Sequence, residues 1–168
     1  MEQTDRCAES VNSLTLAEAQ ARICESVTPI SGVECIPLKQ ARSRVLAERL
    51  VASIDLPPFP NSAMDGYAFR HGDITGQMDS SLTVIGTSFA GKPYEGLLGP
   101  GQCVRIFTGA AIPAGADTVI MQEDVIRVAD HIRLAREVSQ HANVRPIGDE
   151  IRLGECLLER GKMLQAAD

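Results

Sequence analysis

The chain has 168 residues, enough for one large domain or two small ones, and 44% of them are hydrophobic. Its formal net charge is −6, with 16 basic residues scattered among 22 acidic ones, so it lacks the clustered lysines and arginines of nucleic-acid-binding proteins. The sequence shows no apolar run near the roughly 18 residues that cross a bilayer. Its five cysteines have no zinc or redox spacing, so we expect a cytoplasmic protein with reduced thiols and no membrane or nucleic-acid partner.

The N-terminal third is predicted to be a disordered tail followed by a helix and short extended segments. We place the tail at residues 1–12 and the helix within residues 13–27. Thr15 and Glu18 have the spacing of a capping box at the helix N-terminus. Residues 33–38 are predicted to be a short strand, and residues 38–56 to begin as a helix that becomes a strand near residue 47.

After residue 60, short apolar runs alternate with glycine and proline, a pattern typical of all-β structure. We predict strands at residues 66–69, 81–89, 102–107 and 117–123, and a hairpin at residues 124–138. In the hairpin, Asp130 and His131 are predicted to form the turn. These strands are too short and too rich in glycine for a parallel sheet covered by helices, so we expect a small barrel or a curled sheet.

The stretch "PPFPNSAMDGYAF" surrounds one carboxylate with turn-forming residues. We expect Asn61 or Ser62 to cap a single helical turn, and Gly66 to end that turn in a left-handed conformation. Such a turn would hold Asp65 at a rigid corner with Met64 directed inward. The alternative is a purely structural turn, since Asp-Gly is among the commonest turn signals.

A second loop, Thr108-Gly109-Ala110-Ala111, follows a predicted strand. A hydroxyl followed by small residues allows backbone N–H groups to approach an anion. The same residues would also cap a turn, and without further context the cap is the favoured interpretation. The sequence leaves both interpretations open for Thr108.

A third loop, "NVRPIGDEI", places Arg145 near two adjacent carboxylates, Asp149 and Glu150. Carboxylate oxygens are ligands that Mg²⁺ prefers. The two acids are also suited to pairing with Arg145 or to facing solvent. Read without further context, these three loops predict only a β-rich protein whose polar corners could converge.

Taken together, the loops resemble one family: molybdopterin molybdenumtransferase of the MoeA and gephyrin E-domain type. The resemblance rests on "LPPFPNSAMDGYAF", "GKPYEG", "GPGQCVRIFTGAAIPAGADTVIMQED" and "NVRPIGDEI", in the family's order, and covers about residues 14–164. It implies an α+β, mostly β fold: an elongated dimerisation domain at 13–56 plus 143–168, and a β-barrel-like domain inserted at 57–142. The family's pterin-binding domain is absent from the sequence, so we expect either an excised fragment or a truncated gene product.

The resemblance also implies an activity: insertion of molybdenum from molybdate into adenylylated molybdopterin, with Mg²⁺, by a homodimer. It implies catalytic roles for Asp65 and Thr108, substrate contacts for Asn61, Ser62, Gly109 and Arg145, and metal binding by Asp149 and Glu150. Because only one wall of the active site is recognisable, we expect this chain alone to be inactive. The alternative is a non-catalytic dimerisation or interaction module.

The sequence departs from the family pattern at two places. Pro60 stands where the family commonly has Asp, and Gly148-Asp149-Glu150 stands where it commonly has Gly-Glu-Asp. The first change removes one acidic group from the corner of Asp65. The second keeps the charge but alters its reach, so it leaves open which of the two acids would be the metal ligand.

Overall fold

The computed structural model of the protein describes residues 14–74 and 81–168. Contacts divide the chain into two compact units. The first combines the N-terminal segment up to Arg44 with the C-terminal residues Leu164–Asp168, and the second is Val45–Met163. The predicted tail of residues 1–12 lies outside the described residues. Within those described ranges, none of the helices has the length and apolar character needed to cross a membrane.

The first unit contains the predicted N-terminal helix, α1 (Leu16–Ser26). Its capping box is confirmed, because the Thr15 hydroxyl oxygen accepts the N–H of Glu18 and the Glu18 carboxylate accepts the N–H of Thr15. No residue of α1 is buried, and the apolar side chains of Leu16 and Ile23 are exposed. The helix is therefore stabilised by its cap, and its apolar face is exposed among the residues that the structure describes.

Two predictions for the following segment are wrong. Residues 33–37 have no regular structure, and the helix predicted from residue 38 is the single 3-10 turn η1 (Leu38–Gln40). Ser43 then takes a left-handed conformation with φ 63°, which ends any helical path. The backbone N–H of Ser43 donates to the carbonyl of Leu164 at 2.9 Å, and Leu164 returns a bond to Arg44 at 2.8 Å. The segment is thus paired with a distant part of the chain, which local periodicity does not reveal.

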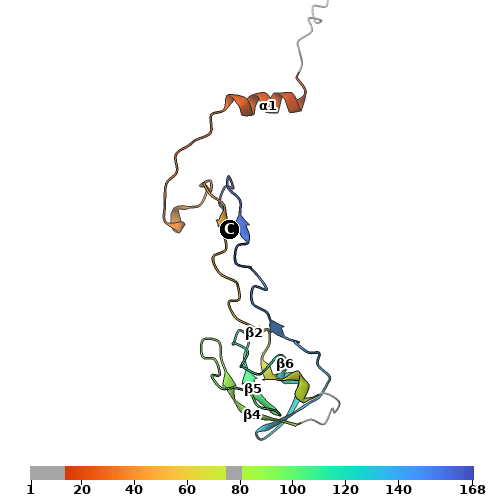
Figure 1. Ribbon diagram of the computed structural model, residues 1–168. Helices are drawn as coiled ribbons and strands as arrows, with labels where there is room; N and C mark the ends of the chain where they lie inside the picture. The colour runs from red at the N-terminus through yellow and green to blue at the C-terminus, as the bar shows by residue number, and fades with distance from the viewer. Residues whose placement is uncertain (1–13, 75–80) are drawn as a thin grey trace, which may run out of the picture. The chain divides into compact units, whose positions relative to one another are not determined.

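In the second unit, two chain segments run antiparallel toward a sheet (Figure 1). The strand β1 (Leu50–Val51) pairs with β10 (Cys156–Leu158), and β2 (Asn61–Ser62) pairs with β9 (Val144–Arg145). Between these pairs, an isolated bridge joins residues 56 and 151. These short ladders bring the first and third sequence loops, residues 61–65 and 145–150, to neighbouring strands.

The sheet has six strands in the order β6-β3-β5-β4-β8-β7 (Figure 1). Only β4 and β5 are parallel, and the other neighbours are antiparallel. The sheet is curled, and every strand matches a predicted one. The bounds are β3 (Gly66–Phe69), β4 (Ser81–Ser88), β5 (Gln102–Ile106), β6 (Thr118–Met121), β7 (Val125–Val128) and β8 (His131–Leu134).

The hairpin of β7 and β8 turns one residue earlier than predicted. His131 pairs with Val128 inside the ladder, so the turn is formed by Ala129 and Asp130. Ala129 has φ 52°, a left-handed conformation that suits a two-residue hairpin loop.

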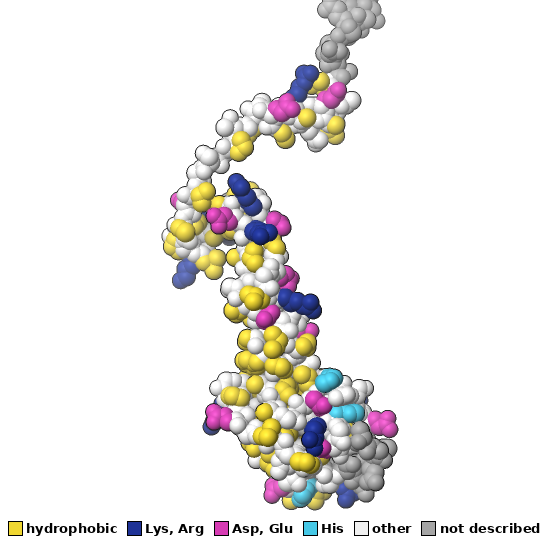
Figure 2. Space-filling view, viewed as in Figure 1, with side chains coloured by type: hydrophobic (Ala, Val, Ile, Leu, Met, Phe, Trp, Pro, Cys, Tyr) yellow, Lys and Arg dark blue, Asp and Glu magenta, His cyan; other side chains and the backbone are white. Residues whose placement is uncertain are grey.

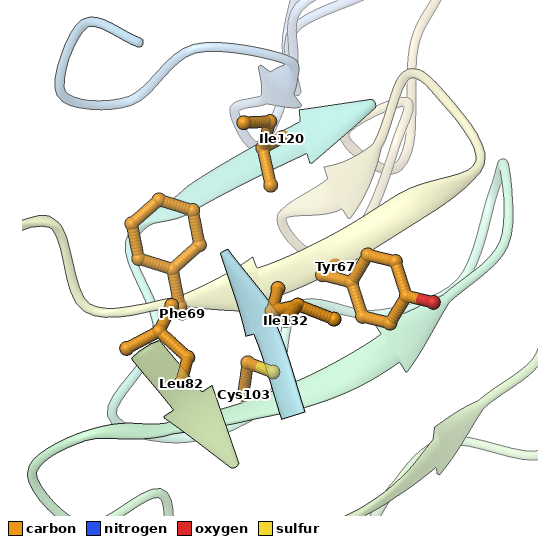
Figure 3. Packing of buried hydrophobic residues seen from close by; sticks show 6 residues of the cluster. All are labelled: Tyr67, Phe69, Leu82, Cys103, Ile120 and Ile132. Carbon is orange, nitrogen blue, oxygen red and sulfur yellow. The ribbon is translucent and has the colours of Figure 1, made fainter. Parts of the chain in front are cut away.

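The core is divided between the two faces of the sheet by strand alternation. One face carries the six buried side chains drawn in Figure 3: Tyr67, Phe69, Leu82, Cys103, Ile120 and Ile132. The other face carries a smaller cluster of Ala68, Ile106, Ala110 and Val119. Since residues 68, 106 and 110 belong to the segments that flank Asp65 and Thr108, this smaller core fixes the backbone beneath both.

Candidate functional site

Asp65 and Thr108 form one hydrogen-bonded pair although 43 residues separate them. Asp65 directly precedes β3, and Thr108 lies two residues after β5, which is the antiparallel neighbour of β3. The Oδ1 atom of Asp65 accepts the backbone N–H of Thr108 at 2.8 Å and its hydroxyl at 2.7 Å. Thr108 is exposed and Asp65 half-buried, so the pair lies at an accessible corner.

These contacts keep the carboxylate of Asp65 ionised. The N–H of Thr108 lowers the pKa of Asp65 below its usual range, and the hydroxyl of Thr108 and the charge of Arg105 lower this pKa further. The second oxygen, Oδ2, accepts no hydrogen bond from the described residues. The bonds to Oδ1 therefore orient the carboxylate, and Oδ2 is the atom left to accept a hydrogen bond from a ligand.

The loop after β5 uses its N–H groups within the protein. The N–H of Gly109 donates to the carbonyl of Ser62 at 2.8 Å, and the N–H of Ala110 donates to the carbonyl of Phe107 at 2.9 Å. Gly109 has φ +81°, which glycine adopts at low cost. With Thr108 donating to Asp65, the N–H groups of the first three residues of this four-residue loop have internal partners. Substrate contact by Gly109 stays a prediction.

The corner before Asp65 differs from the predicted helical turn. Residues 61 and 62 belong to β2, and Met64 is 42% exposed, so the predicted helical turn and inward Met64 are wrong. Ser62 is fully buried, where its hydroxyl donates to the carbonyl of Met64 at 2.5 Å and accepts the N–H of Met64 at 3.3 Å. This side chain forms the tight bend that turns the backbone toward Asp65.

Gly66 has a different role from the predicted left-handed residue. It is the first residue of β3 and is absent from the positive-φ residues of the described chain. A β-carbon at this position would lie 1.9 Å from the carbonyl oxygen of Ile120 on β6. The glycine is therefore needed because two strands approach closely beside Asp65, which a turn signal alone does not predict.

Arg105 is a site residue that sequence reasoning missed. Its guanidinium donates to the carbonyl of Gly66 at 2.9 Å and to Oε1 of Gln122, and it lies over the rings of Tyr67 and Phe107. One signal was available in the sequence. Arg105 occupies the alternating strand position shared with Cys103 and Phe107, where an apolar residue would be expected.

Glu123 also lies near this corner, in η3 (Gln122–Asp124). A hydrogen bond from the side chain of Gln122 lowers the pKa of Glu123; Arg105 also lowers it, whereas the charge of Asp65 raises it. In the sequence, Glu123 stands only as the last residue of the strand predicted at residues 117–123. The side-chain amide of Gln122 donates to the carboxylate of Glu123 at 3.0 Å, and the N–H of Gln122 donates to the carbonyl of Asp65 at 3.1 Å, so Gln122 links this second carboxylate to the backbone of Asp65.

The third loop forms a separate polar group. Arg145 on β9 lies opposite Asn61 on β2, and its guanidinium lies 3.7 Å from the carboxylate of Glu150. Asp149 is exposed. Across residues 14–74 and 81–168, no hydrogen bond or ion pair joins Arg145, Asp149 or Glu150 to Asp65 or Thr108. The roles predicted for these residues stay predictions.

Asn61 has one unusual feature. Its side-chain oxygen is buried and has no hydrogen-bond partner among the described residues. A buried acceptor without a donor is costly, so this oxygen is suited to receiving a donor from outside the described chain. In that same part of the chain, no group of three or more His, Cys, Asp or Glu side chains is arranged to hold a metal ion.

Comparisons of sequence and of structure both match this chain to one protein family. The profile of the MoeA N-terminal region (domain I and II) matches residues 14–168. A molybdopterin molybdenumtransferase from Haemophilus influenzae is 40% identical over 152 residues, which cover 90% of this chain and 37% of the relative. One from Staphylococcus aureus is 33% identical over 159 residues, covering 93% and 38%.

A solved structure agrees. The crystal structure of a molybdopterin biosynthesis moeA protein from Pyrococcus horikoshii OT3 superimposes with a TM-score of 0.84 at 36% identity, covering 90% of this chain and 41% of that one. The chain therefore spans well under half the length of the relatives that it matches.

Proposed function

The chain belongs to the MoeA N-terminal region family, and from this premise we propose that it forms part of a molybdopterin molybdenumtransferase. In this proposal the enzyme transfers molybdenum from molybdate into adenylylated molybdopterin, and the described residues form one wall of its active site. The observation that carries the proposal is the Asp65–Thr108 pair, an ionised carboxylate fixed on one oxygen and open on the other.

The proposed transfer of molybdenum requires fixed polar groups from this chain rather than a nucleophile. Asp65 holds its charge at an exposed corner, which suits orienting a substrate or positioning a proton at Oδ2. Arg145 supplies an exposed cation that suits an anionic substrate group. We assign Ser62 and Gly109 to the support of the corner, because both already bind backbone groups there.

Mg²⁺ fits the proposal only as an ion shared between carboxylates of this chain and phosphates of the substrate. Protein sites for Mg²⁺ commonly use one or two carboxylates and complete the coordination with substrate phosphates. Asp149 and Glu150 supply such a pair, with the complication that Glu150 lies 3.7 Å from Arg145. When bound, Mg²⁺ would offset phosphate charge. The two acids would hold it, and Arg145 would have to release Glu150.

A second function, as a dimerisation module, is supported by exposed apolar side chains. Ile30 and Val33 in the first unit are 95% and 73% exposed. Within the second unit, hydrophobic side chains are visible along the paired segments that lead to the sheet (Figure 2). The exposed hydrophobic residues of these segments include Leu50, Ile54, Leu153 and Leu157. Surfaces of this kind mark interaction sites, and we propose a second copy of the chain as the partner.

The proposal is tested by transplanting this chain in place of the matching region of the Haemophilus influenzae relative. The chimera should release AMP and form cofactor when given adenylylated molybdopterin, molybdate and Mg²⁺. Asp65→Asn should lower this rate by about 100-fold or more, as for loss of a fixed polar group in other active sites. Asp130→Asn, in the hairpin turn, is the matched control. A folded chimera in which both variants keep equal activity would refute the role of Asp65.

A further inference from the structure

Arg105 has contacts that set it apart from a solvent-facing arginine. It lies in the middle of the sheet on β5, opposite Tyr67 on β3. Its Nη1 donates to the carbonyl of Gly66 at 2.9 Å, and its Nη2 donates to Oε1 of Gln122. Both acceptors lie on the strands that flank Asp65 or directly after them.

These bonds close a ring around the backbone of Asp65. The N–H of Gln122 donates to the carbonyl of Asp65 at 3.1 Å, while Arg105 binds the side chain of Gln122 and the carbonyl of Gly66. Asp65 is thereby held through its own carbonyl and through that of its neighbour. The side chain of Asp65 is held separately, by Thr108, three residues after Arg105.

The contacts require the shape of arginine as well as its charge. The guanidinium carbon lies 5.1 Å from the ring centre of Tyr67 and 4.7 Å from that of Phe107. The ring of Phe107 is in turn stacked on Phe89, with centres 4.9 Å apart and planes at 8°. A planar fork matches two acceptors and two ring faces, whereas the single nitrogen of lysine does not.

Two carboxylates lie within electrostatic range of this guanidinium. Its charge lowers the pKa of Asp65 and of Glu123, whereas the charge of Asp65 raises the pKa of Glu123. No ion pair in the described part of the chain joins Arg105 to either of them. Arg105 therefore leaves Oδ2 of Asp65 open while its charge lowers the pKa of the carboxylate.

We propose that Arg105 is a positioning residue, which holds the Asp65 corner through Gly66 and Gln122 and so keeps Asp65 aligned with Thr108. Its importance for catalysis rests on the function proposed above. Its effect on the geometry of the corner does not, and is measurable without any substrate.

The test compares Arg105→Met, Arg105→Lys and the control Arg127→Met in the full chain by NMR. Arg127 lies on β7, where its side chain donates to the carbonyl of Ala129. In Arg105→Met, the pKa of Asp65 should rise toward its ordinary value, and the Thr108 amide should exchange roughly two- to tenfold faster, the range for the loss of about one hydrogen bond. In Arg105→Lys, the pKa of Asp65 should rise less than in Arg105→Met, but the Thr108 amide should still exchange faster than in the wild type. Arg127→Met should change neither.

A purely structural role would lower the melting temperature but leave the folded-state pKa of Asp65 and the exchange of Thr108 unchanged, and that result overturns the proposal. If Arg105→Lys has the wild-type pKa of Asp65 and the wild-type exchange of the Thr108 amide, the planar shape of the guanidinium is not needed, and that part of the proposal is overturned. If Arg105→Met fails to fold, Gln122→Leu removes one acceptor and leaves the arginine in place, and Thr108 should again exchange faster. Since none of these readouts uses turnover, an inactive chimera would refute the proposed function alone.

Discussion

The backbone of Gly66 lies so close to Ile120 that a β-carbon on residue 66 would be 1.9 Å from the carbonyl oxygen of residue 120. No real contact is this short, and the atom in the way belongs to the backbone of β6, which cannot rotate aside. Strand separation next to Asp65 is therefore set by the absence of a side chain at residue 66.

We expect Gly66→Ala to lower the free energy of unfolding by about 2–4 kcal/mol, since it forces two central strands apart. Urea denaturation at neutral pH measures this change. Gly72→Ala is the control, because a β-carbon there meets nothing within 4 Å. Equal stability of the two variants would contradict the close approach of β3 and β6.

Thr108→Val should raise the pKa of Asp65 without restoring its ordinary value. The substitution removes the hydroxyl donor but keeps the backbone N–H, which is the larger cause of the lowered pKa. Carbon-13 NMR of the Asp65 carboxyl during an acid titration measures the change. Thr87→Val, at an exposed position of β4, should leave the titration as it is.

The same contact predicts a pH dependence of stability. Because the folded pKa of Asp65 is lower than the unfolded one, the pair stabilises the protein above the unfolded pKa, and this contribution disappears as the pH falls through the folded pKa. The wild type should therefore melt at a higher temperature than Thr108→Val at pH 7, and the difference should narrow as the pH falls through the pKa of Asp65 in the folded protein. A gap that widens on acidification would contradict this sign.

Cys103 should resist alkylation in the folded protein. Burial in the sheet core raises the pKa of its thiol to about 12, so at pH 8 only about one thiol in ten thousand is ionised. Cys24 and Cys35 are exposed and should react first. Peptide mass spectrometry after a short pulse of iodoacetamide tests this order. In 8 M urea the three should react at similar rates, and early labelling of Cys103 in buffer would contradict its burial.

The stacked rings of Phe89 and Phe107 should couple energetically. Aromatic pairs contribute about 0.5–1.5 kcal/mol beyond their buried area, so a double-mutant cycle of Phe89→Leu and Phe107→Leu should return an interaction energy in that range. Chemical denaturation of the four proteins measures it. Strict additivity would show that the stack contributes nothing to stability.

The exposed apolar face of α1 gives a test of self-association. We expect light scattering at micromolar concentration to give about twice the 18.0 kDa chain mass, and Ile23→Asp to shift the protein toward monomer because it charges an apolar contact. Gln20→Glu adds the same charge outside the apolar positions and serves as the control. Monomers at all concentrations for the unmodified chain would remove the basis for a homodimer.

The sequence was most informative where local chemistry decides the structure. The cap of α1 is determined by Thr15 and Glu18, which are three residues apart, and each strand of the sheet follows from apolar runs bounded by turn residues. Prediction failed where distant segments decide. The pairing of Ser43 with Leu164 replaces a helix, and the approach of β6 to β3 gives Gly66 a role that its neighbours do not reveal.

The candidate site likewise contains residues that the sequence identified and one that it did not. The resemblance identified Asp65 and Thr108, and the structure brings them within 2.8 Å. Arg105 was missed because its partners, Gly66 and Gln122, come from two other strands and their ends. A residue that acts by bridging strands has no local sequence signature beyond a charge at an apolar strand position.

The pairing of β2 with β9 has a further consequence for how such a chain can be assembled. Asn61 and Arg145 are direct partners, so everything between them leaves and rejoins the paired segments at a single point. Chain ends that lie this close allow a whole folded region to be inserted, removed or circularly permuted with only a short linker. We therefore expect that a circular permutant, with the original ends joined and new ends opened in the turn between β7 and β8, would keep the pairing of β2 with β9.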